Sequence, residues 1–297
     1  NTGSPTCSAG GGSQIFWTAN TRDAEMHLTE AIAGNGVITD QAFDPNTGLI
    51  QSITAGPIGS PTSVADFVYG FDTLGNLTNR QDVIENYTER FCYDSLNRLT
   101  NYAIGATCTS TGTKTVRYDA LGNITSKTGV GTYNYSGISA GPHAVTSITG
   151  TVNGVVNPIY TYDANGNQTC EYATSGGNCT TSAARLVTWT SFNMASQITQ
   201  GSTVVNLTYD TEHARVKQVI GSNTTYYLND PSSGAMSEKL LSGATTTWHD
   251  YILADGKIIA QRTAVVGGGT ALNYFVLDHL GSVSVITDAG GSVITGG

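Results

Sequence analysis

The chain repeats a short pattern in which an aromatic residue precedes Asp, and a Gly-Asn turn and a β-forming residue follow. The pattern reads YGFDTLGNLTN at residues 69–79, FCYDSLNRLTN at 91–101, VRYDALGNITS at 116–126 and YTYDANGNQTC at 160–170. Self-similarity at a regular spacing indicates one supersecondary unit stacked many times. The repeat therefore constrains the fold more than any single residue, and it favours an architectural role over a catalytic pocket.

The Asp positions mark the units. Asp44, Asp72, Asp94 and Asp119 are 28, 22 and 25 residues apart, and Asp163 follows after 44 residues, which leaves room for two units. The intervening unit would be the aromatic pair Tyr133 and Tyr135, and weaker copies follow at Phe192, Asp210, Asp230, Asp255 and Asp278. Roughly ten units therefore cover residues 41–297, with no stretch left for a separate second domain. Residues 1–40 contain no copy and are assigned no role.

Around each Asp, β-forming residues flank a polar turn, which predicts a β-hairpin. The Asp carboxylate can accept hydrogen bonds from backbone amides further along the turn, and the Gly adopts a positive φ at low cost. We therefore expect an all-β protein of tandem hairpins with four- or five-residue loops. The residues predicted to form these structural turns are Asp44, Asp72, Gly75, Asn76, Asp94, Asp119, Gly122, Asn123, Asp163, Gly166, Asn167 and Asp210.

Composition agrees with a turn-rich β protein and argues against several other classes. Gly accounts for 36 of 297 residues, charged residues for 12% and hydrophobic residues for 39%, so the chain is not a disordered tail. The net charge is −9 and the cations are scattered, whereas a nucleic-acid groove needs a basic stripe. No run approaches the roughly 18 apolar residues of a membrane helix. The best helical candidate is the short segment 23–32.

The two ends of the chain look arbitrary. No leader precedes Asn1, which is not an initiator Met, and Gly297 follows directly on a strand-like segment. We therefore expect a processed or partly observed piece of a longer protein, truncated at its C-terminal end.

The five cysteines allow two interpretations. Cys92 and Cys108 bracket one hairpin, and Cys170 and Cys179 bracket a turn-rich loop, so we expect each set to form a local disulfide. Cys7 would be unpaired or joined to a segment outside this chain. Disulfides would imply an oxidising compartment. The alternative is that the cysteines are free and buried as small hydrophobic residues. No CxxC pair occurs, which argues against a zinc ribbon.

The repeated Tyr-Asp units resemble those of the rearrangement hot spot (RHS) family, also called YD-repeat proteins. The segment Tyr274–Val283, which contains the core motif Asp278, His279, Leu280, Gly281 and Ser282, strengthens the resemblance, as does Ile286-Thr-Asp-Ala-Gly-Gly after it. The stretch Gly141–Ser147 is similar to another part of these proteins. The resemblance covers nearly the whole chain from about Ala42 onward.

The resemblance implies a long antiparallel sheet that coils into a hollow shell. In bacterial toxins of the family the shell encloses a variable C-terminal effector, and related modules in animal teneurins act at cell surfaces. Some members release the effector with an aspartyl autoprotease located after the core motif. Nothing in this chain matches that element, so we carry over no catalytic residue, and we expect neither an enzyme nor a cofactor.

More specific chemistries have weaker support than structural roles. The Asp-x-x-Gly-Asn turns lack the spacing and the distant Glu of a calcium loop. His279 beside Asp278 and Ser282 is not a catalytic triad, because no G-x-S-x-G elbow accompanies it. Trp17, Trp189 and Trp248 are candidates for stacking on sugars, although Trp usually contributes buried area. The other histidines are solitary and show no metal-binding spacing.

Three functions remain open. The leading one is a non-catalytic wall of a secreted or cell-surface RHS protein, of bacterial origin, that encapsulates or presents a polypeptide such as a toxin effector. The second is an extracellular adhesive or carbohydrate-binding module that contacts a surface glycan or receptor. The third is a surface polymer that self-associates by pairing of strand edges, because an edge low in Lys and Pro invites another strand. None of the three uses nucleic acid or a membrane span.

Overall fold

The computed structural model describes residues 15–105, 107–109, 112–136, 141–230, 234 and 236–294. All regular structure in these residues is β, with 25 strands and no helix. Each strand pairs antiparallel with its neighbour along the chain, except that the two-residue strand Val155–Val156 pairs only with the strand before it, and together they form one sheet. The predicted all-β hairpin array is therefore confirmed.

The strands are short, and most have five to seven residues, the ordinary length for globular proteins. The first nine are β1 (Trp17–Arg22), β2 (Leu28–Ala33), β3 (Ile38–Phe43), β4 (Ile50–Gly56), β5 (Ala65–Phe71), β6 (Leu77–Asp82), β7 (Tyr87–Tyr93), β8 (Leu99–Ile104) and β9 (Lys114–Tyr118). The next nine are β10 (Ile124–Lys127), β11 (Gly131–Asn134), β12 (Ser147–Val152), β13 (Val155–Val156), β14 (Pro158–Tyr162), β15 (Gln168–Ala173), β16 (Arg185–Trp189), β17 (Ala195–Gln200) and β18 (Thr203–Tyr209). The last seven are β19 (Arg215–Ile220), β20 (Asn223–Asn229), β21 (Met236–Ser242), β22 (Thr245–Ala254), β23 (Lys257–Val265), β24 (Thr270–Leu277) and β25 (Val283–Thr287).

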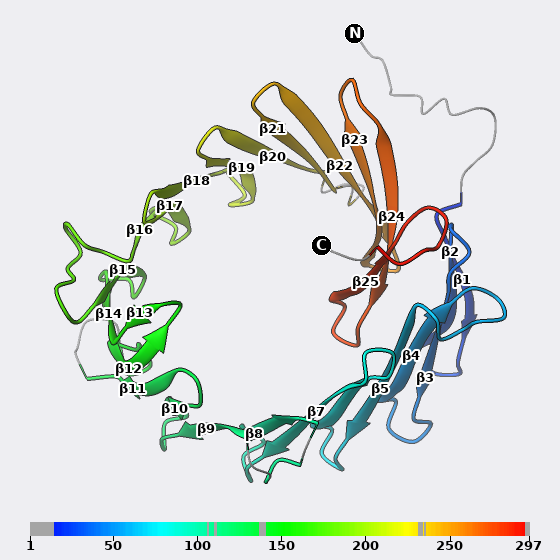
Figure 1. The fold of residues 1–297 in the computed structure, drawn as a ribbon, viewed down its shortest axis with the longest axis horizontal. Coiled ribbons are helices and arrows are strands. Elements are labelled where there is room, and N and C mark those ends of the chain that lie inside the picture. The colour runs from blue at the N-terminus through cyan, green and yellow to red at the C-terminus, as the bar shows by residue number, and fades with distance from the viewer. Residues whose placement is uncertain are drawn as a thin grey trace.

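The sheet coils into a ring, and its last strands return to its first (Figure 1). Strands β24 and β25 lie beside β1–β5, on the inner side of the ring. No pairing among the described strands joins β1 to β25, so the sheet overlaps itself instead of closing through hydrogen bonds. A hydrophobic cluster of the overlap contains residues of β4 and β5 together with Val276 of β24. We call this overlap the seam.

Successive turns of an antiparallel sheet lie alternately at its two edges. The turns that contain the repeated Asp residues follow β3, β5, β7, β9, β14, β18 and β24, so they all lie on one rim of the ring. We call it the Asp rim. The turns after β4, β6, β8, β10 and β23 lie on the other side, which we call the opposite rim. The 22- to 28-residue repeat is thus two strands and two turns.

The best helical candidate in the sequence, residues 23–32, is not a helix. Asp23 begins a turn in which Met26 has a φ of 69°, and Leu28–Ala33 is strand β2. A short segment becomes a strand when neighbours complete its hydrogen bonding, and β2 pairs with both β1 and β3. The described part of residues 1–40 thus belongs to the same sheet as the repeats. Cys7 lies outside the described residues.

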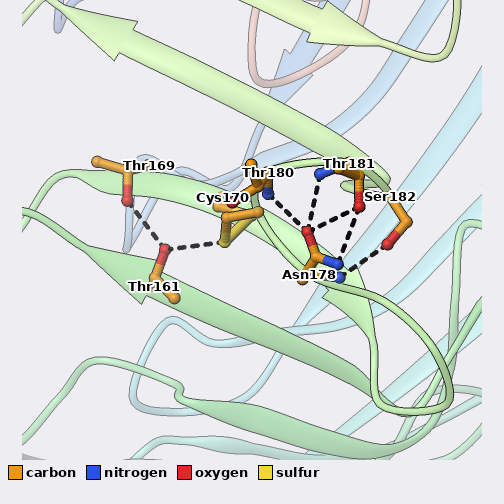
Figure 2. Close-up of a disulfide and its surroundings, with 8 residues drawn as sticks. Thr161, Thr169, Cys170, Asn178, Thr180, Thr181 and Ser182 are labelled. Carbon is orange, nitrogen blue, oxygen red and sulfur yellow. Dashed lines mark hydrogen bonds between the residues drawn. A yellow bond between two sulfur atoms is a disulfide. The ribbon is translucent and has the colours of Figure 1, made fainter.

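The structure pairs the cysteines as predicted, Cys92 with Cys108 and Cys170 with Cys179. The second disulfide fastens a loop to β15, and Asn178 shapes this loop (Figure 2). Asn178 Oδ1 accepts hydrogen bonds from the backbone N–H groups of Thr180 and Thr181, both at 2.8 Å. The loop is thus held by a cross-link and by an internal cap, which is typical of turns that contain Asn.

We expect loss of the second disulfide to lower stability locally. Replacement of both Cys170 and Cys179 by Ser opens the loop between these two cysteines, which are nine positions apart in the sequence. The change should cost about 2–3 kcal/mol of unfolding free energy, because the unfolded chain regains loop entropy. Urea unfolding followed by far-ultraviolet circular dichroism measures it. Reduction of the wild type must lower stability further than reduction of the double variant, since only the wild type has this bond to lose. Equal effects would contradict a cross-link here.

Candidate functional site at the turns and the seam

Each repeated Asp caps its own turn. In the turn after β5, Asp72 Oδ1 accepts hydrogen bonds from the backbone N–H groups of Leu74 and Asn76, both at 2.9 Å. Asp72 Oδ2 accepts a third bond from the Asn76 side-chain amide at 2.9 Å. Gly75 has a φ of 83°, which explains why Gly or Asn stands at this position. One carboxylate therefore fixes the whole five-residue turn.

The same arrangement recurs around the Asp rim. Oδ1 accepts from the residues two and four positions later at Asp94, Asp119, Asp163, Asp210 and Asp278. The residue three positions after the Asp has a positive φ in each of these turns: Asn97, Gly122, Gly166, His213 and Gly281. Asp44 caps a turn one residue longer, with N–H donors from Asn46 and Thr47. Asp255 differs, because it forms a two-residue turn with Gly256.

In most units the Tyr or Trp that precedes the turn ties its hairpin to the preceding one, whereas Phe43 and Phe71 have no donor group. Tyr93 Oη donates to the Leu77 carbonyl at 2.8 Å, and Tyr118 Oη donates to the Leu99 carbonyl at 2.9 Å. Each acceptor stands five residues after the Asp of the previous unit. The remaining bonds of this type run from Tyr135 to Ile124, Tyr162 to Val145, Trp189 to Gln168 and Tyr209 to Ala195. The Tyr-Asp dipeptide therefore joins two functions, a link between units and a cap within one.

Side chains also bridge adjacent turns along the Asp rim. The Asn76 amide donates to Asn97 Oδ1 at 3.0 Å, and the Asn167 amide donates to Asn193 Oδ1 at 2.9 Å. His143, from the predicted stretch Gly141–Ser147, lies 2.7 Å from Asn123 Oδ1 through its Nδ1. The final residue of a turn thus bonds both to its own Asp and to the next turn.

These contacts lower the pKa of the Asp72, Asp94 and Asp163 carboxyls. Hydrogen bonds from the Asn76 side chain and backbone hold the pKa of Asp72 below its ordinary value, and Arg98 acts in the same way on Asp94. The Asn167 side chain is the main cause for Asp163. Donors that favour the charged form lower a carboxyl pKa. The turns therefore depend on ionised Asp.

The seam is mainly apolar. One cluster joins Val37, Ile53, Ala55 and Phe67 of the first strands to Val276 of β24. A second joins Ile259, Ala260 and Tyr274 of the last strands to Phe16 and Trp17. Two faces of one sheet thus pack against each other where the ring overlaps, and the burial of apolar side chains drives the contact.

Polar contacts align the seam. The Asn35 side-chain amide donates to Thr287 Oγ1 at 2.9 Å and to the Asp288 carbonyl at 2.8 Å. Arg22 forms an ion pair with Asp255 at 2.9 Å. Gly34 permits the close approach, because a Cβ there would lie 2.6 Å from Tyr274 Oη and 2.5 Å from the Ile15 carbonyl. Two short segments near the N-terminal end, at Arg22 and at Gly34-Asn35, therefore engage the last strands.

The core motif lies at the seam. Asp278 caps its turn through the N–H groups of Leu280 and Ser282, both at 2.9 Å. The His279 ring packs on Tyr69 with a centroid distance of 4.4 Å. Burial lowers the pKa of His279, and burial raises the pKa of Tyr69 to about 12. The arrangement is that of a neutral packing His beside a turn cap.

Other chemistries find little geometric support in the described residues. No group of three His, Cys, Asp or Glu side chains there could hold a metal ion. The three Trp side chains are engaged within the sheet: Trp17 packs in the seam, Trp189 donates to the Gln168 carbonyl, and Lys239 lies over Trp248. The described residues contain no long apolar helix that could span a membrane.

Sequence reasoning missed the turn at Asp23, the cap of the Phe192 turn, and the seam. Asp23 caps a turn through Glu25 and His27, with Met26 in place of Gly. Thr190 occupies the Asp position in the unit of Phe192, and its hydroxyl accepts from the Met194 N–H at 3.1 Å. An alignment of all repeat units would have revealed both the Asp23 turn and the Thr190 cap. Asn35 carries no local signal, because its partners are about 250 residues away.

Comparison with solved structures finds the same fold in Tc toxin chains. A structure of the Photorhabdus luminescens Tc holotoxin pore matches with a TM-score of 0.66 and 15% identity over 95% of this chain. A TcdB2–TccC3 crystal structure matches with a TM-score of 0.66 and 16% identity over 95% of this chain. The chain spans only 15% to 16% of the length of those chains. No protein-family profile and no curated protein matches the sequence. At this identity the likeness shows the fold.

We expect stability to fall at low pH because the caps become protonated. The pKa values of Asp72, Asp94 and Asp163 are lower in the folded chain than the ordinary 3.8, so their contribution to stability is present above that value and is lost as pH falls through the folded pKa. Thermal unfolding at steps from pH 6 to below 3 measures the loss. A variant with Asp72, Asp94 and Asp163 replaced by Asn keeps the acceptor oxygen and should show a flatter profile. An unchanged profile would exclude these three carboxyls as the cause.

Replacement of Gly34 by Ala should loosen the seam. The added Cβ meets the Tyr274 hydroxyl and the Ile15 backbone, and overpacking of this kind typically costs about 1–3 kcal/mol. Amide hydrogen exchange should accelerate in β1, β2, β24 and β25, and less in β9–β18, which lie away from the seam. Gly269→Ala is the matched control, since nothing lies within 4 Å of its Cβ. Equal exchange in both variants would refute the close approach.

Proposed function

We propose that this chain is a segment of the wall of an RHS-repeat shell that encloses or presents a polypeptide. The single observation that carries the proposal is the ring itself, in which one antiparallel sheet coils until its last strands pack on its first. Such a sheet surrounds space instead of filling it. The repeated Tyr-Asp turns and the Asp278–Ser282 motif support membership of the RHS family, and the Tc toxin fold likeness agrees with it.

A wall role accounts for the side chains that invite a chemical interpretation. The carboxylates cap turns, the tyrosine hydroxyls link hairpins, and His279 packs on Tyr69. We therefore propose a non-catalytic segment, with any processing or toxic activity supplied by other parts of the parent protein. The proposed cargo is a polypeptide of the same parent chain.

The disulfides support a location outside the reducing cytosol. Two cross-links fasten loops of the ring, and such bonds persist in oxidising compartments. We propose that the parent protein is secreted or displayed at a bacterial surface. A Tc-like complex would offer it further polypeptide partners.

Protease protection tests the enclosure of a polypeptide. An unstructured, trypsin-sensitive segment is fused after Gly297, and its cleavage is compared with that of the same segment added separately to the chain. The fused segment should be cleaved more slowly, because the ring wall blocks the protease. Equal cleavage rates would contradict enclosure.

A seam variant serves as the control. Asn35→Ala removes two hydrogen bonds to β25 and its turn while leaving the Tyr-Asp links intact. Protection should decrease in this variant if the closed ring provides it. Circular dichroism establishes that the variant remains folded. Undiminished protection would show that the segment is shielded by something other than the closed ring.

A further inference from the structure

The Asp rim carries a row of exposed leucines. The residue two positions after Asp is Leu74, Leu96 and Leu121 in the turns after β5, β7 and β9, and these side chains are 66% to 73% exposed. Single exposed apolar residues are ordinary. Here the same position is apolar in three consecutive turns of one rim. Neighbouring turns are two strands apart, so the leucines stand at intervals of about 10 Å.

The turn itself does not require Leu. Asn165 occupies the same position after Asp163 and donates its backbone N–H to the carboxylate at 2.9 Å, as Leu74, Leu96 and Leu121 do. Glu212 does so after Asp210. Because a polar residue satisfies the geometry equally well, the fold does not explain the row.

The opposite rim carries a matching row in the same part of the ring. Ile58 lies in the turn after β4, Ile84 in the turn after β6, and Ile104 at the end of β8, with exposed fractions of 48% to 89%. Their spacing is again one residue for every two strands. The two rows are offset by one strand, because turns of the two rims alternate along the chain.

We propose that a second copy of this chain stacks rim on rim, with the Asp rim of one copy on the opposite rim of the other. When the second copy is displaced by one strand length along the strand direction, the leucine row of one copy meets the isoleucine row of the other. Leu74 then falls between Ile58 and Ile84 of the second copy, and Leu96 falls between Ile84 and Ile104. Each apolar side chain enters a gap in the facing row and is removed from water.

Charge favours this orientation over an Asp rim on an Asp rim. The second arrangement would bring the carboxylates of Asp72, Asp94 and Asp119 together. In the proposed stack, Asp119 faces the ends of β9 and β10 that carry Lys114 and Lys127. Neither lysine forms an ion pair within the part of the chain that the structure describes.

Two acidic residues on the opposite rim act against the stack. Asp82 ends β6 and Glu85 lies in the turn beside Ile84, so both face the Asp72 turn of the second copy. Electrostatic attraction is therefore confined to the β9–β10 hairpin. Elsewhere the apolar rows hold the copies together. Added salt should weaken the association only slightly, because screening removes attraction and repulsion alike.

The two contacting surfaces differ, so the interface is heterologous. A heterologous interface leaves one free copy of each surface at the ends of an assembly, and association continues unless the geometry closes. The proposal therefore predicts stacks that lengthen with concentration. This differs from pairing of strand edges, because the turns make the contact.

Sedimentation velocity over a range of concentrations tests the stack. The wild type should form a series of oligomers, and the variant Leu74→Asn, Leu96→Asn, Leu121→Asn should remain monomeric. Each substitution should raise the dissociation constant at least about tenfold, given the value of burying a Leu side chain. Asn is already present in the corresponding turn of Asp163, so the variant keeps the turn hydrogen bonds. A wild type that is monomeric at high concentration overturns the proposal.

Mixing two variants tests the orientation. The variant Ile58→Asn, Ile84→Asn, Ile104→Asn should also be monomeric, yet its Asp rim is intact. Mixed with the leucine variant, whose opposite rim is intact, it should form dimers and nothing larger. Dissociation by the leucine variant alone, with normal oligomers of the isoleucine variant, would instead indicate Asp rim on Asp rim and overturn the proposal.

A substitution outside the rows provides the control. Ile220 is 37% exposed on the opposite rim, at the end of β19, where the turn that faces it has Glu212 instead of Leu. Ile220→Asn should leave the oligomers unchanged. If it dissociates them as the isoleucine substitutions do, the contact is not confined to the two rows and the proposal fails.

Discussion

A single sheet coiled into a ring depends on the links between neighbouring hairpins. Each hairpin contacts mainly the one before it and the one after it, as in other repeat architectures. Where a tyrosine precedes the Asp, as at Tyr93 and Tyr118, it supplies a direct link, because its hydroxyl donates to a carbonyl just beyond the previous turn. The Asp beside it caps the next turn. Two adjacent residues therefore fix both the shape of a unit and its distance from its neighbour.

The seam differs from the rest of the wall in kind. Away from it, neighbouring strands share backbone hydrogen bonds, whereas at the seam two faces pack through apolar side chains. The contacts of Asn35 with Thr287 and Asp288 then set the alignment. Apolar packing is non-directional, so it permits overlap without a fixed register. The polar contacts of Asn35 therefore supply the directional specificity that the apolar packing of the seam lacks.

The sequence predicted the local structure of the turns far better than the closure of the ring at the seam. The repeats located most Asp-rim turns because Asp and a positive-φ Gly or Asn act within five residues. The turn at Asp23 was not recognised, because Met26 stands there in place of Gly and the segment was only a short helical candidate. Thr190 escaped notice because a hydroxyl takes the role of the carboxylate. Gly34 and Asn35 were beyond reach, since their partners come from the last strands and no periodicity marks such long-range contacts.

The same turns that stabilise the ring also determine what its rims present. A cap uses the Asp carboxylate, the positive-φ residue and two backbone N–H groups. The side chain of the second residue after Asp therefore has no role in the turn. That position is Leu in four turns, Asn after Asp163 and Glu after Asp210. Leu280 is also exposed but stands alone in the core-motif turn, whereas the other three leucines stand together on β5–β10. Where a position is free to vary within a rigid scaffold, its side chains reflect contacts made outside the scaffold. The rims, more than the faces of the sheet, are therefore the surfaces where this wall would meet its neighbours.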